Sequence, residues 1–119
     1  MSSAALARRF PTMRPEQAPE IGGLLARIRE TYAPVAVLLY GSKARGDGRP
    51  DSDWDLKVIV ADDAPEALLS PMLGWAVQAG SGVHADISCA RISEFEADLS
   101  IANSAAREVL RDGILLDAA

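Results

Sequence analysis

The fold of this chain is decided by two stretches of its sequence, LLYGSKARG at residues 38–46 and SDWDLKVIV at residues 52–60. The first is an apolar run that ends at Gly41 and continues into polar residues. It predicts a buried strand over 34–40, followed by a turn into a helix. The second alternates polar and apolar residues before it becomes wholly apolar, so we expect another strand over 53–60. A period of two places Asp53 and Asp55 on the same face of that strand.

The turn at Gly41 and Ser42 is suited to binding an anion. Glycine lets the backbone approach a ligand closely, and the amide groups at the start of a helix favour a phosphate. The Ser42 hydroxyl adds a hydrogen-bond donor, and Lys43 or Arg45 adds positive charge. An ordinary strand-to-helix turn has the same local pattern, so the motif takes its meaning from the aspartates that follow it.

Asp53 and Asp55 alternate along one strand, which separates their Cβ atoms by about 7 Å. Such a pair can hold Mg²⁺, which takes one or two protein carboxylates and completes its octahedron with water and substrate phosphates. A solvated strand edge is the simpler interpretation of the pair. A third carboxylate, Asp86, lies in the alternating run 83–89, which predicts another strand. Three aspartates on neighbouring strands would repel one another unless protons or cations neutralised them, so the sequence predicts a site for a metal ion and a nucleotide.

A calcium site can be drawn from the same aspartates. Asp51, Asp53 and Asp55 have the spacing of the first ligands in an EF-hand loop, with Asp62 at the twelfth position. The sixth position is Leu56, where that loop needs glycine, and the residues after it are typical of a strand. We therefore reject this interpretation.

A catalytic triad of Ser42, His84 and Asp86 is a further alternative. His84 and Asp86 share a strand face at a spacing that does not orient an imidazole, and the sequence has no nucleophile elbow. His84 is therefore interpreted as a packing or edge residue.

The composition limits the classes of function. The 119 residues are 49% hydrophobic and carry 12 Lys and Arg against 17 Asp and Glu, a net charge of −5. This charge disfavours broad binding to nucleic acid or to an anionic membrane, although it leaves room for a local basic patch. No apolar run approaches the roughly 20 residues that span a bilayer. A single cysteine excludes an internal disulfide and fits a reducing compartment, so we expect a cytoplasmic protein.

The remaining sequence predicts one domain over 15–119, preceded by a flexible arm over 1–14. We expect helices over 19–31 and 104–112 and helical segments that begin at Asp63 and Ser93, the former interrupted at Ser70-Pro71. A short apolar segment, 114–116, follows the last helix. Together with the three strands, these elements predict an α/β fold in which helices flank a mixed sheet.

Three motifs carry a resemblance to a known family: Gly41-Ser42, the Asp53 and Asp55 pair after ten intervening residues, and Asp86 between apolar neighbours. Together they resemble the nucleotidyltransferase superfamily, which includes DNA polymerase beta. The match is closest to the minimal nucleotidyltransferases, the MNT partners of HEPN proteins in prokaryotic toxin–antitoxin pairs. It extends from the helix before Pro34 to the apolar segment after Gly113.

The resemblance implies a role for each motif residue. The catalytic and metal-binding set is Asp53, Asp55 and Asp86, and the nucleotide-binding set is Gly41, Ser42, Lys43 and Arg45. The first two aspartates would hold Mg²⁺ against the triphosphate of ATP, and the third would complete the metal site or deprotonate the acceptor. The glycine and serine would grip the β- and γ-phosphates, and Arg45 would steady them. The sequence departs from the family pattern at Trp54 and at Lys43.

The acceptor is the open part of this prediction. Larger family members recognise it with an added helical domain, for which about 119 residues leave no room. We therefore expect the acceptor surface to be shared with a partner chain or with a second copy. The resemblance implies a HEPN-type helical partner that is neutralised by adenylylation. Two alternatives remain, a nucleotide-binding antitoxin that acts by occlusion and an enzyme that modifies a small alcohol.

Overall fold

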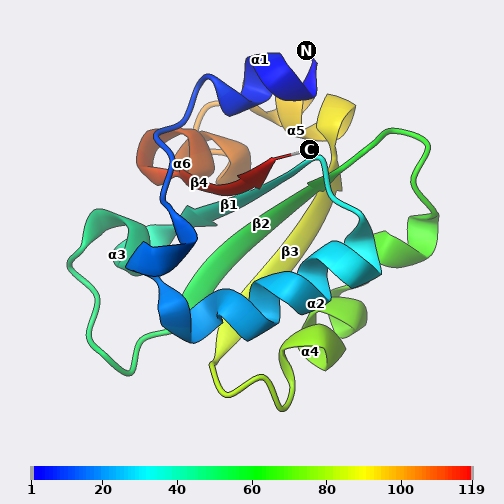
Figure 1. Ribbon diagram of the computed structural model, residues 1–119. Helices are drawn as coiled ribbons and strands as arrows, with labels where there is room; N and C mark the ends of the chain where they lie inside the picture. Colours follow the sequence, from blue (N-terminus) through cyan, green and yellow to red (C-terminus); the bar gives the residue numbers. More distant parts are fainter. Residues whose placement is uncertain (1, 119) are drawn as a thin grey trace.

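A four-stranded sheet in the order β3-β2-β1-β4 runs through the computed structural model, which describes residues 2–118 (Figure 1). Met1 and Ala119, at the outer ends of the predicted arm and domain, lie outside the described residues. The strands are β1 (Ala36–Tyr40), β2 (Trp54–Val60), β3 (Ala85–Arg91) and β4 (Ile114–Ala118). β2 and β3 are parallel, whereas β1 is antiparallel to both of its neighbours. This mixed sheet confirms the predicted fold class, and the three predicted strands are adjacent.

Six α-helices are described in residues 2–118, together with three short 3-10 turns. The helices are α1 (Ser3–Ala7), α2 (Gly22–Tyr32), α3 (Gly41–Arg45), α4 (Pro71–Gln78), α5 (Ile92–Asp98) and α6 (Ala105–Asp112). The turns are Pro15–Gln17, Pro19–Ile21 and Glu66–Leu69. The predicted break at Ser70-Pro71 is confirmed, because the Ser70 hydroxyl accepts a hydrogen bond from the Met72 amide and caps α4. None of the described helices has the length and apolar character needed to cross a membrane.

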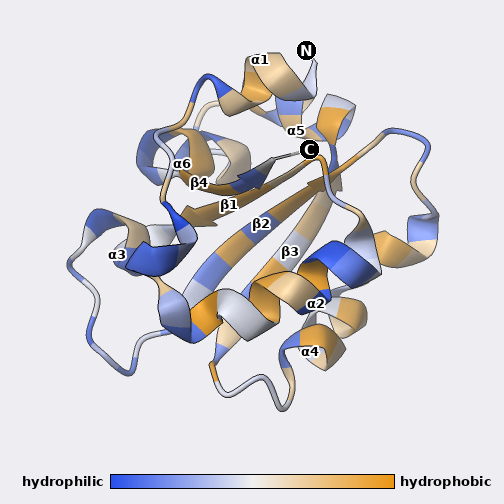
Figure 2. Cartoon of the chain, in the orientation of Figure 1, coloured by the Kyte–Doolittle hydropathy of each residue, from blue (hydrophilic) through white to orange (hydrophobic). Residues whose placement is uncertain are grey.

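Apolar side chains on both faces of the sheet form two hydrophobic clusters. In Figure 2 the ribbon of β1 is orange, and that of β2 alternates between orange and blue. Leu56 and Val58 of β2 belong to the cluster under α2, whereas Ile59 belongs to the cluster that contains Phe95 of α5. Each such side chain contributes about 2 kcal/mol when it is fully buried. The alternation therefore fixes the register of β2 and turns Asp55 toward the α5 and α6 side of the sheet.

The N-terminal segment packs against the sheet, whereas the sequence predicted a flexible arm over 1–14. Leu6 and Phe10 are only 1% and 6% exposed and belong to the cluster on the α5 side. The Met13 amide donates to the Leu115 carbonyl over 2.9 Å, which ties the segment to β4. A five-residue helix is unstable by itself and gives almost no periodic signal, so its order depends on tertiary burial that local patterns do not reveal.

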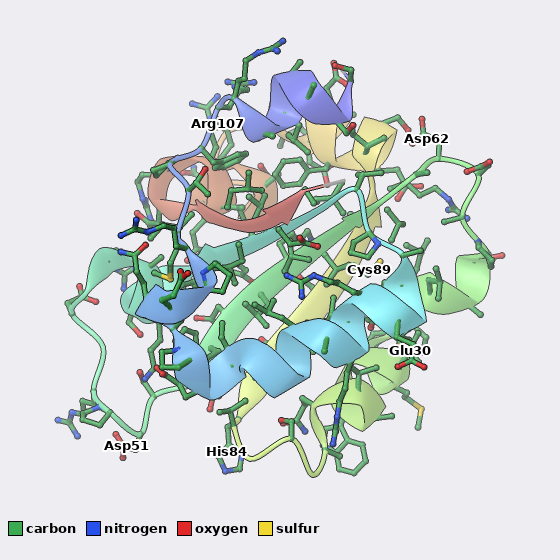
Figure 3. The ribbon with its side chains drawn as sticks, viewed as in Figure 1. Glu30, Asp51, Asp62, His84, Cys89 and Arg107 are labelled. Atoms are coloured by element: carbon green, nitrogen blue, oxygen red, sulfur yellow. The ribbon has the colours of Figure 1, made fainter. Side chains whose placement is uncertain are left out.

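Cys89 is expected to react slowly with alkylating reagents. It is partly buried on β3 and packs against the cluster under α2, where Figure 3 labels it. Burial raises the pKa of its thiol from 9.0 to about 11. Because only the thiolate is nucleophilic, this shift lowers the reactive fraction about a hundredfold near neutral pH. Iodoacetamide labelling followed by mass spectrometry should show that difference between native and urea-unfolded protein, and equal rates in the two states would contradict it.

Candidate functional site

The predicted site lies where β1 ends, α3 begins and β2 starts. Tyr40 and Asp55 are Cα partners across β1 and β2, so Gly41 follows directly beside the aspartate. Gly41 has a φ angle of 73°, and a Cβ atom at this position would overlap Oδ2 of Asp55. Glycine permits both the left-handed backbone and the close approach. The Asp55 carboxylate consequently lies against the turn that was expected to bind phosphate.

The three predicted aspartates lie near one another. Asp55 and Asp86 are Cα partners in the parallel pair of β2 and β3, and neighbouring strands are about 4.8 Å apart. Asp53 lies just before β2, and both Asp53 and Asp86 are exposed. Burial raises the pKa of Asp55, and the negative charges of Asp86 and Asp53 raise it further. The fold therefore brings together carboxylates that are separated in the sequence.

Whether this site can bind Mg²⁺ depends on how the carboxylate groups are arranged. Over residues 2–118, no group of three or more His, Cys, Asp or Glu side chains forms a ready-made set of metal ligands. Mg²⁺ does not require such a set, because it is commonly held by one or two carboxylates together with water and substrate phosphates. Asp55 suits that arrangement, since it is partly desolvated and repelled by acidic neighbours, and a bound cation would relieve the repulsion. Metal binding by the aspartates stays a prediction.

The loop after α3 folds back over Ser42. The amides of Gly46 and Asp47 both donate to the Ser42 carbonyl, over 3.0 and 3.2 Å. A Cβ atom on Gly48 would lie 2.9 Å from Oγ of Ser42, so the absence of a side chain at Gly48 lets the loop come close. In the part of the chain that the structure describes, the Ser42 hydroxyl makes no hydrogen bond to protein. It can therefore donate to a ligand.

The two cations expected at the phosphates are engaged by protein groups. The Nζ atom of Lys43 lies 5.0 Å from the centroid of the Trp54 ring and donates to the Pro50 carbonyl over 3.3 Å. Arg45 forms a 3.1 Å ion pair with Asp112 of α6 and a second ion pair within its own loop. Phosphate binding by Lys43 and Arg45 thus stays a prediction, and it requires both side chains to exchange their present partners.

Three residues near the aspartates were absent from the prediction: Tyr40, Ser88 and Glu108. Burial raises the pKa of Tyr40, a hydrogen bond with the Ser88 side chain lowers it, and the charges of Asp55, Asp86 and Glu108 raise it again. Ser88 lies two residues after Asp86, so the alternation of the strand could have identified it. Glu108 gives no such signal, because only the packing of α6 brings it near the sheet.

An open hollow of about 760 Å³ lies beside α6. Its lining extends over residues 102–111 and includes Arg107, Glu108 and Arg111. Glu108 also lies within electrostatic range of Asp55. The negative charge of one residue that lines the hollow therefore contributes to the raised pKa of Asp55.

The two alternative sites are not formed. Figure 3 shows Asp51 and Asp62 at opposite ends of the molecule, because the extended strand β2 separates them, whereas an EF-hand loop would bring its ligands together. Within residues 2–118, no hydrogen bond links the His84 side chain to Ser42 or to Asp86. The geometry therefore supports neither a calcium loop nor a catalytic triad.

Comparisons with known proteins place these residues in a wider context. A family model described as "Polymerase beta, Nucleotidyltransferase" matches residues 25–117, a range that includes every predicted site residue. A search of curated proteins found no match. Among solved structures, a chain in the "Crystal structure of the toxin-antitoxin with AMP-PNP" is similar at a TM-score of 0.48 and 17% identity, over 82% of this chain and 72% of that one. A likeness of that size says nothing about the ligand or partner of this chain.

Proposed function

Because this chain belongs to the Polymerase beta nucleotidyltransferase family, we propose that it transfers AMP from ATP to a hydroxyl group on a partner protein in the cytoplasm. One observation carries the proposal. The Asp55 carboxylate lies against the Gly41 turn and is paired in register with Asp86. A family member that only bound nucleotide would have no need for a second carboxylate beside the first.

In the proposed reaction the acceptor oxygen attacks the α-phosphorus of ATP. The bond from that phosphorus to the oxygen bridging to the β-phosphate breaks, and pyrophosphate leaves. Amides at the start of α3 and the Ser42 hydroxyl donate hydrogen bonds to the β- and γ-phosphates. Asp86, exposed at the start of β3, accepts the proton of the acceptor hydroxyl. Asp53 and Asp55 would hold Mg²⁺, which would supply neutralisation of the charge that develops on the phosphate oxygens.

We further propose that the acceptor belongs to a HEPN-type helical protein and that this chain is the antitoxin of the pair. Trp75 and Met72 support a protein partner, because they lie one helical turn apart on α4 and are 70% and 80% exposed. Exposed aromatic residues of this kind are typical of protein interfaces. The net charge of −5 favours encounter with a partner that is basic overall.

A transfer assay tests the proposed activity directly. Wild type and an Asp53→Ala/Asp55→Ala double variant are incubated with Mg²⁺, ATP labelled at the α-phosphate, and the protein encoded beside this chain. We expect label on that protein with wild type alone. Label on a small alcohol in place of the protein would instead support an enzyme that modifies small molecules.

A non-catalytic antitoxin is the second candidate, and a specific observation favours it. Lys43 and Arg45 are both engaged by protein groups, so each would have to leave its present partner to pair with a triphosphate. An antitoxin that works by occlusion needs no such cations. Equal neutralisation of the partner by wild type and by the double variant, without label, would establish this candidate.

Ser42→Ala is expected to weaken ATP binding about fivefold, because a hydroxyl that donates to a charged phosphate is lost. Isothermal titration calorimetry with ATP and Mg²⁺ measures the effect. Ser100→Ala is the matched control, since the Ser100 hydroxyl donates to the Ala97 carbonyl at the end of α5 and should leave ATP affinity unchanged. Equal affinities of the Ser42 variant and wild type would remove Ser42 from the phosphate site.

A further inference from the structure

Asp112, the last residue of α6, is bound by two arginines at once. Its side chain is only 8% exposed. Arg111 donates to both carboxylate oxygens, from Nε to Oδ1 and from Nη2 to Oδ2, each over 3.2 Å. Arg45 of α3 donates from Nη1 to Oδ2 over 3.1 Å. A carboxylate at the end of a helix opposes the helix dipole, so the two cations offset an otherwise unfavourable placement.

Arg45 also lies close to the proposed phosphate site. It follows Ser42 by three residues in α3, and residues at this spacing share one face of a helix. The Arg45 side chain is exposed, and α6 packs beside α3 (Figure 1). Arg45 therefore has two alternative anions within its surroundings: the Asp112 carboxylate, and a triphosphate that accepts a hydrogen bond from the Ser42 hydroxyl.

The second arginine makes it easier for Arg45 to leave Asp112. Removing the partner of a carboxylate that is largely buried is normally unfavourable, because its charge is left unpaired. Asp112 would keep its two hydrogen bonds with Arg111, and bidentate pairs of this kind are among the stronger charged contacts. The other ion pair of Arg45, with Asp47 over 3.1 Å, is exposed, and exposed pairs contribute little. Arg45 can therefore exchange Asp112 for a ligand without leaving a buried charge unpaired.

We propose that Asp112 and a bound triphosphate compete for Arg45, and that Arg111 favours the triphosphate by keeping Asp112 paired after Arg45 has left. Asp112 is thus a positioning residue, which acts on the nucleotide only through Arg45. The apparent affinity for a ligand falls with the fraction of molecules that are competent to bind it, here those in which Arg45 is released. The inference rests on the proposed function, which supplies the triphosphate, but it concerns binding and can be measured without an acceptor.

Variants of Asp112 and Arg111 are expected to change the affinity for ATP in opposite directions. Asp112→Asn removes the competing charge, so ATP should bind about fivefold more tightly. Arg111→Gln leaves Asp112 dependent on Arg45, so ATP should bind about fivefold more weakly. Isothermal titration calorimetry with ATP and Mg²⁺ measures both effects, and melting temperatures show whether each variant is folded. Arg111 is exposed, so its variant decides the question if Asp112→Asn does not fold.

Three controls separate this exchange from a general effect of charge. Glu108→Gln removes the same charge from an exposed position on α6, one turn before Asp112, and should change ATP affinity by less than about twofold. In an Arg45→Gln background, Asp112→Asn should no longer tighten ATP binding, because there is no arginine to release. AMP lacks the β- and γ-phosphates, so Asp112→Asn should leave the affinity for AMP unchanged.

Three results would overturn the inference: unchanged ATP affinity in folded Asp112→Asn or in Arg111→Gln, an equal gain in Glu108→Gln, or a gain that persists in the Arg45→Gln background. The outcome is separable from that of the transfer assay. The expected changes in affinity without labelling of any acceptor would contradict the proposed reaction and leave the competition for Arg45 in place. Labelling of the partner protein with unchanged affinities would contradict the competition alone. If neither wild type nor Asp112→Asn bound ATP, both proposals would be wrong.

Discussion

Asp55→Asn is expected to lower the rate of AMP transfer by roughly a hundredfold or more. The Asp55 carboxylate lies against the Gly41 turn beside Asp86, so it is placed to hold a cation against the triphosphate. Asparagine has nearly the same shape but no negative charge, which removes the attraction for Mg²⁺ while it preserves packing. The measurement is the initial rate of transfer of labelled AMP to the partner protein, with saturating ATP and Mg²⁺.

Asp62→Asn is the control for this variant. Asp62 lies beyond the opposite end of β2, where its Oδ1 atom accepts a 2.9 Å hydrogen bond from the Ser93 amide at the start of α5. Asparagine can accept the same hydrogen bond, so both stability and transfer should remain close to those of wild type. A transfer rate for Asp55→Asn within tenfold of the Asp62→Asn rate would show that the Asp55 charge does not drive the reaction.

Gly41→Ala is expected to reduce transfer about as strongly as Asp55→Asn and also to destabilise the fold. Alanine at a φ angle of 73° costs about 1–2 kcal/mol in backbone strain. Its methyl group would also overlap Oδ2 of Asp55, so the carboxylate must move away from the turn. Transfer assays and urea denaturation measure the two effects separately.

Gly46→Ala separates the effect of backbone strain at positive φ from the effect of displacing the Asp55 carboxylate. Gly46 ends α3 with a φ angle of 82°, and nothing lies within 4 Å of a Cβ atom built on it. We expect a loss of about 1–2 kcal/mol in the free energy of unfolding and an unchanged rate of transfer. If Gly41→Ala lost stability to the same extent and kept its activity, close contact between the turn and Asp55 would have no catalytic role.

Local pattern determined the elements that form the site. The alternation in SDWDLKVIV predicted β2 and the shared face of its aspartates, because side chains alternate along a strand wherever it occurs in a fold. Gly41-Ser42 predicted the turn into α3, because positive φ at a close approach requires glycine. The pairing of Asp86 with Asp55 needed one further step, the assumption that β2 and β3 are neighbours, which the sheet order confirms.

The sequence by itself therefore determined β1, β2 and β3, the aspartate face and the glycine turn, since each depends on residues close together in the chain. The segment 114–116 was predicted only as a short apolar segment, and in the structure it belongs to β4. Only the tertiary structure decided where α6 lies, that Glu108 comes near the aspartates, and that Arg45 pairs with Asp112. It alone also showed that Leu6 and Phe10 pack against the sheet. These contacts join segments that are remote in sequence, and they form because burial and charge pairing in the whole fold stabilise them. The periodicity of a short sequence segment does not indicate how much such long-range contacts stabilise the fold.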